Sequence, residues 1–159
     1  MHPNAALLHR LFSALDAHDH ATMASCYHED ATFWDIAFSL RNKKEIHSMW
    51  NMICDGDIRA TFEVANANDH DGQVKLVDIY TFGATADKPG RAVRNVVDSR
   101  FRFRDGLIAE HRDFCDARAW AGMAIGGPAG FLAGRLRILR CWKAKQLLAA
   151  FVARHPQYQ

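Results

Sequence analysis

Residues 101–116 read Phe-Arg-Phe-Arg-Asp-Gly-Leu-Ile-Ala-Glu-His-Arg-Asp-Phe-Cys-Asp, a pattern that predicts two antiparallel strands joined at Asp105-Gly106. An Asp-Gly pair between alternating runs is a strong hairpin signal, because both turn positions require positive φ. Successive strand residues point to opposite faces, so the second strand should place His111 and Asp113 on one face. The same face should carry Leu107, Ala109 and Cys115. A histidine beside a carboxylate can be an acid/base pair or a structural hydrogen bond, and the pattern leaves both open.

The size and composition are those of one globular domain. The chain has 159 residues, 49% of them hydrophobic and 24% charged, which is enough to bury a core and ordinary for a soluble protein. No apolar run approaches the ~20 residues of a membrane span, and the first residues do not resemble a secretory signal. The cysteines are scattered without a C-x-x-C pair, so we expect reduced thiols and a cytoplasmic protein.

The hydrophobic period is helical in the first third of the chain. Leucines and a phenylalanine at helical spacing predict a helix over residues 5–18. Asp19 can cap a second short helix that Glu29-Asp30 ends, and residues 31–35 resemble a short strand. Residues 42–45, Asn-Lys-Lys-Glu, form a capping box that begins a third helix.

The period then changes to that of strands. Alternation predicts strands over residues 58–64, 74–82 and 92–104, followed by the second strand of the hairpin. Helices followed by a meander of long strands are typical of an α+β fold. Alternating arginines and phenylalanines over residues 100–104 favour a solvated outer face over an anion site.

Four aspartates are the candidates for chemistry. Asp78 lies in the middle of an apolar strand face, between Leu76 and Tyr80. Its companions on other strands are Asp35, Asp98 and Asp113. Carboxyl groups that share an apolar pocket raise one another's pKa, and such a group can exchange a proton near neutral pH. Each aspartate could instead bond a neighbouring side chain or amide.

Several other kinds of site lack a sequence signal. The chain has no G-x-S-x-G, no P-loop and no G-x-G-x-x-G. The spacing of the histidines around residues 18–28 fits no metal site. We therefore expect neither a cofactor nor a metal.

The end of the chain is basic. Of 20 basic residues, six lie from Phe131 onward and 14 before it, and all 18 acidic residues also lie before it. An apolar stripe at helical spacing runs through Leu132, Leu136, Leu139 and Trp142. A basic amphipathic helix can bind anionic lipid or nucleic acid, or it can pack on its own domain or across a dimer. We favour packing, and expect no nucleic-acid partner and no membrane contact.

Three segments in order carry a family resemblance: residues 15–19, Leu-Asp-Ala-His-Asp; residues 27–35, Tyr-His-Glu-Asp-Ala-Thr-Phe-Trp-Asp; and residues 103–116. Together they resemble the nuclear transport factor 2-like superfamily, and within it the SnoaL-like polyketide cyclases. Ketosteroid isomerases and limonene epoxide hydrolases are relatives. The resemblance implies a cone: a curved sheet around a pocket closed by the N-terminal helices, in a homodimer. We expect this cone domain over residues 1–125 and a helical extension over residues 126–159.

The resemblance also implies roles for the aspartates. Asp35 falls where ketosteroid isomerases keep the general base, and Asp98 where they keep the protonated acid of the oxyanion hole. This chain has Leu11 where those enzymes have the oxyanion tyrosine. Asp78 and Asp113 fall where the epoxide hydrolases keep the two carboxylates that activate water.

The resulting hypothesis is a cofactor-independent acid/base enzyme, an isomerase, a cyclase or a hydratase or hydrolase, acting on a small hydrophobic molecule. Asp113 or Asp78 would take a proton, and His111 or Asp98 would donate one. The expected substrate contacts are Trp34, Trp50, Tyr80 and Cys115. The alternative is a non-catalytic domain of the same fold that binds a small ligand or a protein.

Overall fold

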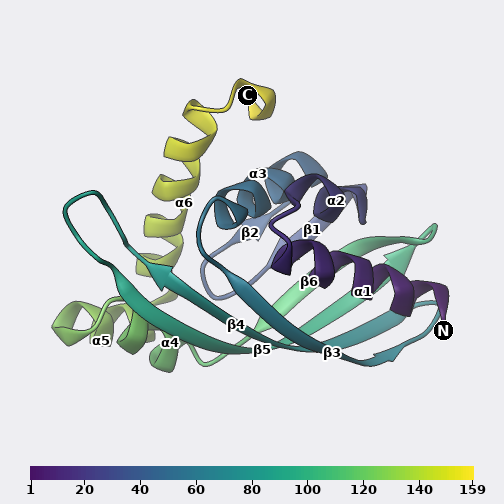
Figure 1. Cartoon of the computed structure of the whole chain (residues 1–159), viewed down its shortest axis with the longest axis horizontal. Helices are drawn as coiled ribbons and strands as arrows, with labels where there is room; N and C mark the ends of the chain where they lie inside the picture. Colours follow the sequence, from purple (N-terminus) through teal and green to yellow (C-terminus); the bar gives the residue numbers. More distant parts are fainter.

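The computed structural model describes residues 1–159 and has an α+β fold, as predicted, built on one curved six-stranded sheet (Figure 1). The strand order is β2-β1-β6-β5-β4-β3, and the sheet is not closed because β2 and β3 form its two edges. All neighbouring strands are antiparallel except β1 and β6, which are parallel. The strands are β1 Tyr27–Trp34, β2 Ser39–Leu40, β3 Arg59–Ala67, β4 Asp71–Phe82, β5 Arg91–Arg104 and β6 Leu107–Phe114.

Three helices cover one face of this sheet, which we call the inner face: α1 Pro3–Asp16, α2 His20–Ser25 and α3 Lys43–Cys54 (Figure 1). The helices α4 Ala117–Ala124 and α5 Gly127–Arg135 lie at one end of the sheet. The last helix, α6 Arg137–Ala153, packs against α3 and is followed by a short 3-10 turn, Pro156–Tyr158. No helix combines the length and hydrophobicity needed to cross a membrane.

The predicted helix caps are confirmed. The Asp19 carboxylate accepts a hydrogen bond from the Thr22 amide at 3.0 Å. Asn42 accepts one from the Glu45 amide at 2.9 Å, and the Glu45 carboxylate reaches back to the Arg41 amide at 2.8 Å. These bonds satisfy amides that would otherwise have no partner at the first turn of a helix.

The predicted end of the second helix is wrong. The helix ends at Ser25, and β1 begins at Tyr27, four residues before the expected strand. Tyr27 pairs in parallel with Ile108 of β6, and its side chain is fully buried. Pairing with a strand far away in the sequence therefore decides the local structure, which residues 20–35 alone could not reveal.

The predicted hairpin is confirmed, with one irregularity. Asp105 and Gly106 have φ of 54° and 74°. Phe103 pairs with Ile108 and Arg102 with Glu110, so Ala109 is the extra residue of a β-bulge. Because of this bulge, Ile108 and His111 are both buried on the inner face, which the predicted strict alternation does not allow.

The C-terminal extension is two helices where one was predicted. Gly126 and Gly127 have φ of 68° and 60° and make the expected break before α5. A second break lies at Leu136, which has extended backbone with φ −109° and ψ 99°. The apolar stripe predicted for one continuous helix is therefore divided between α5 and α6.

The core lies between α1 and the inner face of the sheet. Gly72 of β4 is in the tightest part of it, since a Cβ at this position would lie 2.9 Å from Leu8 Cδ1 and 2.9 Å from Phe103 Cζ. Both neighbours belong to the packed core. This close approach explains why β4 has a glycine at a buried position.

We predict that Gly72→Ala lowers the free energy of unfolding by about 1–3 kcal/mol, because the added methyl group overpacks the core. Gly122→Ala is the matched control: it lies in α4 with nothing within 4 Å of its Cβ. There the better helix propensity of alanine should leave stability unchanged or raise it by up to about 1 kcal/mol. Urea unfolding of both variants measures the difference, and an equal effect would contradict the packing argument.

Candidate functional site

The inner face of the sheet changes from apolar to polar along its length. On β4, buried Val74 and Leu76 are followed by half-buried side chains. The half-buried side chains beyond that point, which we call the polar end, are Asp35, Asp78, Tyr80, Asn95, Asp113 and Cys115. They belong to β4, β5, β6 and the residues that follow β1 and β6. The sheet therefore gathers three of the four candidate aspartates, Asp35, Asp78 and Asp113, at one end of its inner face.

A chain of hydrogen bonds leads from the core to the polar end. Trp50 Nε1 donates to the Tyr27 hydroxyl at 3.1 Å, and that hydroxyl lies 2.7 Å from His111 Nδ1. His111 Nε2 lies 2.7 Å from Asp113 Oδ1, which also accepts a hydrogen bond from the Ser99 hydroxyl at 2.5 Å. We call these five residues the His111 chain.

The donors and acceptors of the His111 chain fit one protonation pattern. Burial raises the pKa of Tyr27 well above its ordinary value, so its hydroxyl stays protonated. The hydroxyl can therefore donate a hydrogen bond to His111 Nδ1. His111 then carries its own proton on Nε2 and donates to the Asp113 carboxylate. Every group in the chain is satisfied by a neutral imidazole and an ionised Asp113.

His111 cannot touch a substrate directly in this arrangement. Its side chain has 0% exposure, whereas that of Asp113 has 14%. The imidazole packs against the rings of Phe33 and Phe101, with ring centroids 4.8 Å and 4.3 Å away. His111 is therefore enclosed and contacts the half-buried Asp113, where the sequence predicted a direct proton donor.

Asp78 is the most perturbed carboxyl group. Burial raises its pKa to about 8, and the negative charge of Asp113 adds to the effect. Its Oδ1 is buried and has no hydrogen-bond partner. A buried oxygen without a partner is costly when the group is charged, so the neutral acid is the stable form at neutral pH.

Asp35 lies just after β1, in a turn that it stabilises itself. Its Oδ1 accepts hydrogen bonds from the amides of Ala37 at 2.7 Å and Phe38 at 2.6 Å. Burial raises the pKa of Asp35 to about 6, although these two hydrogen bonds lower it. The negative charge of Asp113 contributes to the increase.

Two arginines of α6 hold the backbone of this turn. Arg137 Nη2 donates to the Asp35 carbonyl at 3.1 Å, and Arg140 Nε donates to the Ile36 carbonyl at 2.8 Å. Arg140 Nη1 also donates to the Ala133 carbonyl of α5 at 2.6 Å. The C-terminal helices therefore fix the position of Asp35.

The remaining groups of the polar end stay protonated at neutral pH. Burial raises the pKa of Tyr80 to about 12 and that of Cys115 to about 11. The Tyr80 hydroxyl accepts a hydrogen bond from Trp120 Nε1 of α4 at 2.6 Å, which leaves its own proton free to donate. The chain has no group of three or more histidine, cysteine, aspartate or glutamate side chains placed to hold a metal ion.

Two predicted site residues lie elsewhere. Asp98 is on the outer face, where Gln73 donates to it at 2.7 Å and Arg100 pairs with it at 3.0 Å. Burial opposes the effect of these partners, but they hold the pKa of Asp98 below its ordinary value. Trp34 pairs in register with exposed Arg112 and packs on Phe114, with centroids 5.7 Å apart, so it is also on the outer face.

Asp98 was assigned to the wrong face because the two faces of β5 were interchanged. Asp98 was predicted to share a pocket with the other three aspartates, but Val97, Ser99 and Phe101 are the buried residues of β5. Ser99, which the sequence analysis missed, thus takes the inner position next to Asp113. The run of outward arginines on β5 was the signal that could have given the correct phase.

Trp50 and Tyr27 also differ from expectation. Trp50 was predicted to contact substrate, but it is 4% exposed and belongs to the core. Tyr27 was not considered for the site, although it begins one of the segments that carry the family resemblance. Only the parallel pairing of β1 with β6 brings its hydroxyl to His111.

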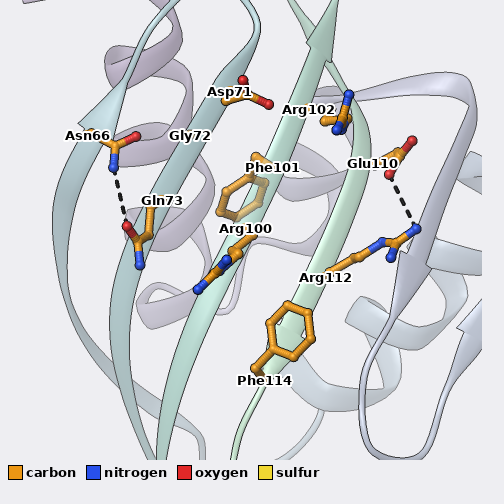
Figure 2. A pocket seen from close by; sticks show the side chains of 10 residues that line it. All are labelled: Asn66, Asp71, Gly72, Gln73, Arg100, Phe101, Arg102, Glu110, Arg112 and Phe114. Atoms are coloured by element: carbon orange, nitrogen blue, oxygen red, sulfur yellow. Dashed lines mark hydrogen bonds and ion pairs between the residues drawn. The ribbon is translucent and has the colours of Figure 1, made fainter.

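Two hollows of the surface lie on the outer side of the sheet. Figure 2 shows a hollow of about 610 Å³ with the helices behind the sheet, bordered by polar side chains. On one side of the hollow Asn66 donates a hydrogen bond to Gln73 at 3.2 Å, and on the other side Glu110 pairs with Arg112 at 3.6 Å. A second hollow of about 490 Å³ lies beside Trp34 and β2. Neither is the apolar pocket predicted inside the cone.

Comparison with known proteins identifies the fold. The model of the SnoaL-like domain family matches residues 8–111. A candidate polyketide cyclase from Silicibacter is similar in structure, with 19% identity, a TM-score of 0.64, and coverage of 74% of this chain and 91% of that one. No curated protein is significantly similar in sequence.

Two structures of named enzymes are similar to the same extent. An epoxide hydrolase of the LEH-like type from M. tuberculosis has 16% identity, a TM-score of 0.60, and coverage of 86% of this chain and 95% of that one. A Delta 5-3-ketosteroid isomerase from Mycobacterium has 17% identity, a TM-score of 0.60, and coverage of 72% and 93%. At such identities the similarity shows the fold and not the activity.

We predict that Asp78→Asn raises stability at neutral and alkaline pH. The folded-state pKa of Asp78, about 8, is above the unfolded value of 3.8. The wild type therefore loses stability as the pH rises between these values, because the unfolded chain ionises first. The asparagine variant should gain on the order of 1–3 kcal/mol over the wild type at about pH 8, and almost nothing near pH 4.

Asp98→Asn is the matched control with the opposite sign. The pKa of Asp98 is lowered by its partners. Its contribution to the free energy of unfolding is therefore present above the unfolded-state pKa and is lost in acid. This variant should be less stable than the wild type at neutral pH. Urea unfolding across the pH range measures both, and an Asp78→Asn protein that is destabilised at neutral pH but not in acid would show that Asp78 is ionised and paired.

Proposed function

The chain belongs to the SnoaL-like domain family, and from its polar end we propose that it is a cofactor-independent acid/base enzyme acting on a small, largely apolar carbonyl compound. One observation carries the proposal: three aspartates lie on the inner face, and their environments separate their pKa values. Two carboxyl groups pushed to different pKa values by their surroundings are the usual basis of paired general acid and base catalysis.

Asp35 is the proposed base. With a pKa of about 6, it is ionised at neutral pH, yet it is a stronger base than an ordinary aspartate. A base with a pKa near the working pH combines the correct protonation state with a useful affinity for the proton. One carboxylate oxygen is held by the Ala37 and Phe38 amides, so the group is oriented while its other oxygen can accept a proton.

Asp78 is the proposed acid. With a pKa of about 8, it holds its proton at neutral pH and can donate it to an oxygen that becomes negative. Its buried Oδ1 supports this role, because no protein group there stabilises the ionised form, so the half-buried carboxyl group keeps a proton to donate. Tyr80, which is also protonated, is a second donor on the same strand face.

The reaction step balances without a cofactor. Asp35 removes a proton from the carbon next to a carbonyl group, the carbonyl oxygen gains a proton or hydrogen bond from Asp78, and an enol forms. Return of the proton to another carbon gives isomerisation, and attack of the enol on a second carbonyl gives aldol-type cyclisation. In hydration, Asp35 would take the proton from water.

The substrate class follows from the side chains of the polar end. None of the six carries a positive charge, so nothing there would balance a substrate carboxylate or phosphate. Phe38 and Trp120 are half-buried beside them and offer aromatic surface. A neutral compound with one or two carbonyl groups suits this combination best.

We predict that Asp35→Asn and Asp78→Asn each slow enolisation by about 10²-fold or more, the scale of general acid/base catalysis. The assay is exchange of carbon-bound hydrogen for deuterium in cyclic enones and β-diketones, followed by NMR in D₂O. It needs no knowledge of the natural product, because proton removal alone gives the signal.

Asp98→Asn is the control for charge loss, because Asp98 is on the outer face and should leave the exchange rate unchanged. Ligand-induced stabilisation without exchange in the wild type would support the alternative, a binding domain of the same fold. Equal exchange in the wild type and both variants would remove Asp35 and Asp78 from the mechanism.

A further inference from the structure

The C-terminal helices carry a cluster of exposed apolar side chains. Ile138 is 76% exposed and Trp142 is 62% exposed, although both belong to a helix that packs on the protein. We call the cluster the α5–α6 face; it consists of Phe131, Leu132, Leu136, Ile138, Leu139 and Trp142. It includes all four residues of the stripe that the sequence predicted to pack.

These side chains are exposed because α6 packs through its opposite side. The buried residues of α6 are Arg140, Ala144 and Phe151. Arg140 takes a core position because its guanidinium satisfies the carbonyls of Ile36 and Ala133. Arg140 is thus turned inward together with Ala144 and Phe151, whereas Ile138, Leu139 and Trp142 point outward, which differs from an ordinary surface helix.

Positive charge borders the α5–α6 face. Ala144 faces the protein, and neighbouring residues of a helix are rotated by about 100° around its axis. The side chains of Lys143 and Lys145 therefore lie on either side of the exposed face. The guanidinium of Arg135 lies over the Phe131 ring at 3.5 Å from its centroid. No aspartate or glutamate follows Asp116 in the chain, so these helices supply no negative charge to balance the cations.

We infer that the α5–α6 face binds the surface of a membrane that contains anionic lipid. An apolar ridge between lysines is the pattern of a helix that lies in the plane of the membrane surface. Leucine, isoleucine and phenylalanine side chains would enter the acyl boundary, and Trp142 would lie at the level of the headgroups. Lys143 and Lys145 would reach the lipid phosphates with their ammonium groups.

The charges argue against a second copy of the chain as the partner. A two-fold symmetric interface places the same surface on both subunits against itself. Such an interface would bring two sets of Arg135, Lys143 and Lys145 into one patch, and these helices supply no acidic side chain to balance them. An anionic lipid surface is complementary to both the charge and the exposed apolar area.

The first experiment is sedimentation of the full chain with phosphatidylcholine vesicles, with and without phosphatidylglycerol. We expect binding only where phosphatidylglycerol is present, and weaker binding at high salt, because the attraction to lipid phosphates is screened. The Asp35→Asn and Asp78→Asn variants should bind as the wild type does, so this result is independent of the proposed activity.

Two double variants test the two components of the face. Lys143→Glu with Lys145→Glu should weaken binding by at least about tenfold, since each basic residue near an anionic surface contributes measurably. Ile138→Ser with Trp142→Ser should also abolish stable binding. The matched control is Arg41→Glu with Lys75→Glu, exposed residues elsewhere that make no side-chain ion pair or hydrogen bond in the structure. All substitutions are at solvent-accessible positions, and circular dichroism confirms folding.

A second measurement reports the depth of contact. Brominated phosphatidylcholine, mixed with phosphatidylglycerol, should quench the tryptophan fluorescence of the wild type, and Trp142→Phe should remove most of the quenching. Absence of binding at low salt, or binding that neither double variant changes, would overturn the proposal. So would a dimer that Ile138→Ser with Trp142→Ser converts to monomer without any lipid binding, or salt-sensitive binding to DNA but not to vesicles.

Discussion

The hydrogen bonds of the His111 chain are the constraint on which the rest of the site depends. A histidine with no exposed side-chain surface must have both ring nitrogens satisfied, since an unpaired buried polar group is costly. Tyr27 of β1 satisfies one nitrogen and Asp113 of β6 the other. The bond to Tyr27 therefore joins the only parallel pair of strands, β1 and β6, and the bond within β6 fixes the carboxylate of Asp113 at the border between the core and the polar end.

A fixed charge at this border has consequences for its neighbours. Asp35 and Asp78 lie in surroundings that already disfavour ionisation, and the charge of Asp113 acts on both. Asp35 is compensated by two backbone amides, whereas Asp78 has an oxygen with no partner, which explains why the pKa of Asp78 is raised further. Burial, together with the charge that this network fixes at Asp113, thereby gives two residues of the same type different pKa values, about 6 for Asp35 and about 8 for Asp78. Such an arrangement reduces stability, a cost that functional sites commonly carry.

The sequence predicted what depends on local pattern and missed what depends on distant contacts. Asp78 was placed on the inner face correctly because Leu76 and Tyr80 flank it on a regular strand. Asp98 was placed on the wrong face because both faces of β5 carry apolar residues, although the alternating arginines further along the strand share the face of Asp98 and mark it as the outer one. The bulge at Ala109 could not be foreseen, because a bulge results from pairing with β5 and leaves no mark in the alternation itself.

For the C-terminal helix α6, the residue pattern was recognised correctly, but the side of the helix that faces the protein was not predicted. The apolar stripe and the basic residues were both recognised, yet Arg140 is inside and Trp142 outside. The reason lies about 100 residues away, where the turn after β1 leaves the carbonyls of Asp35 and Ile36 without strand partners, and the arginines of α6 fill that need. Because these bonds hold the turn that carries Asp35, α6 is part of the site's framework. Its inward side orients a carboxylate, and for that reason its apolar side chains are left on the surface.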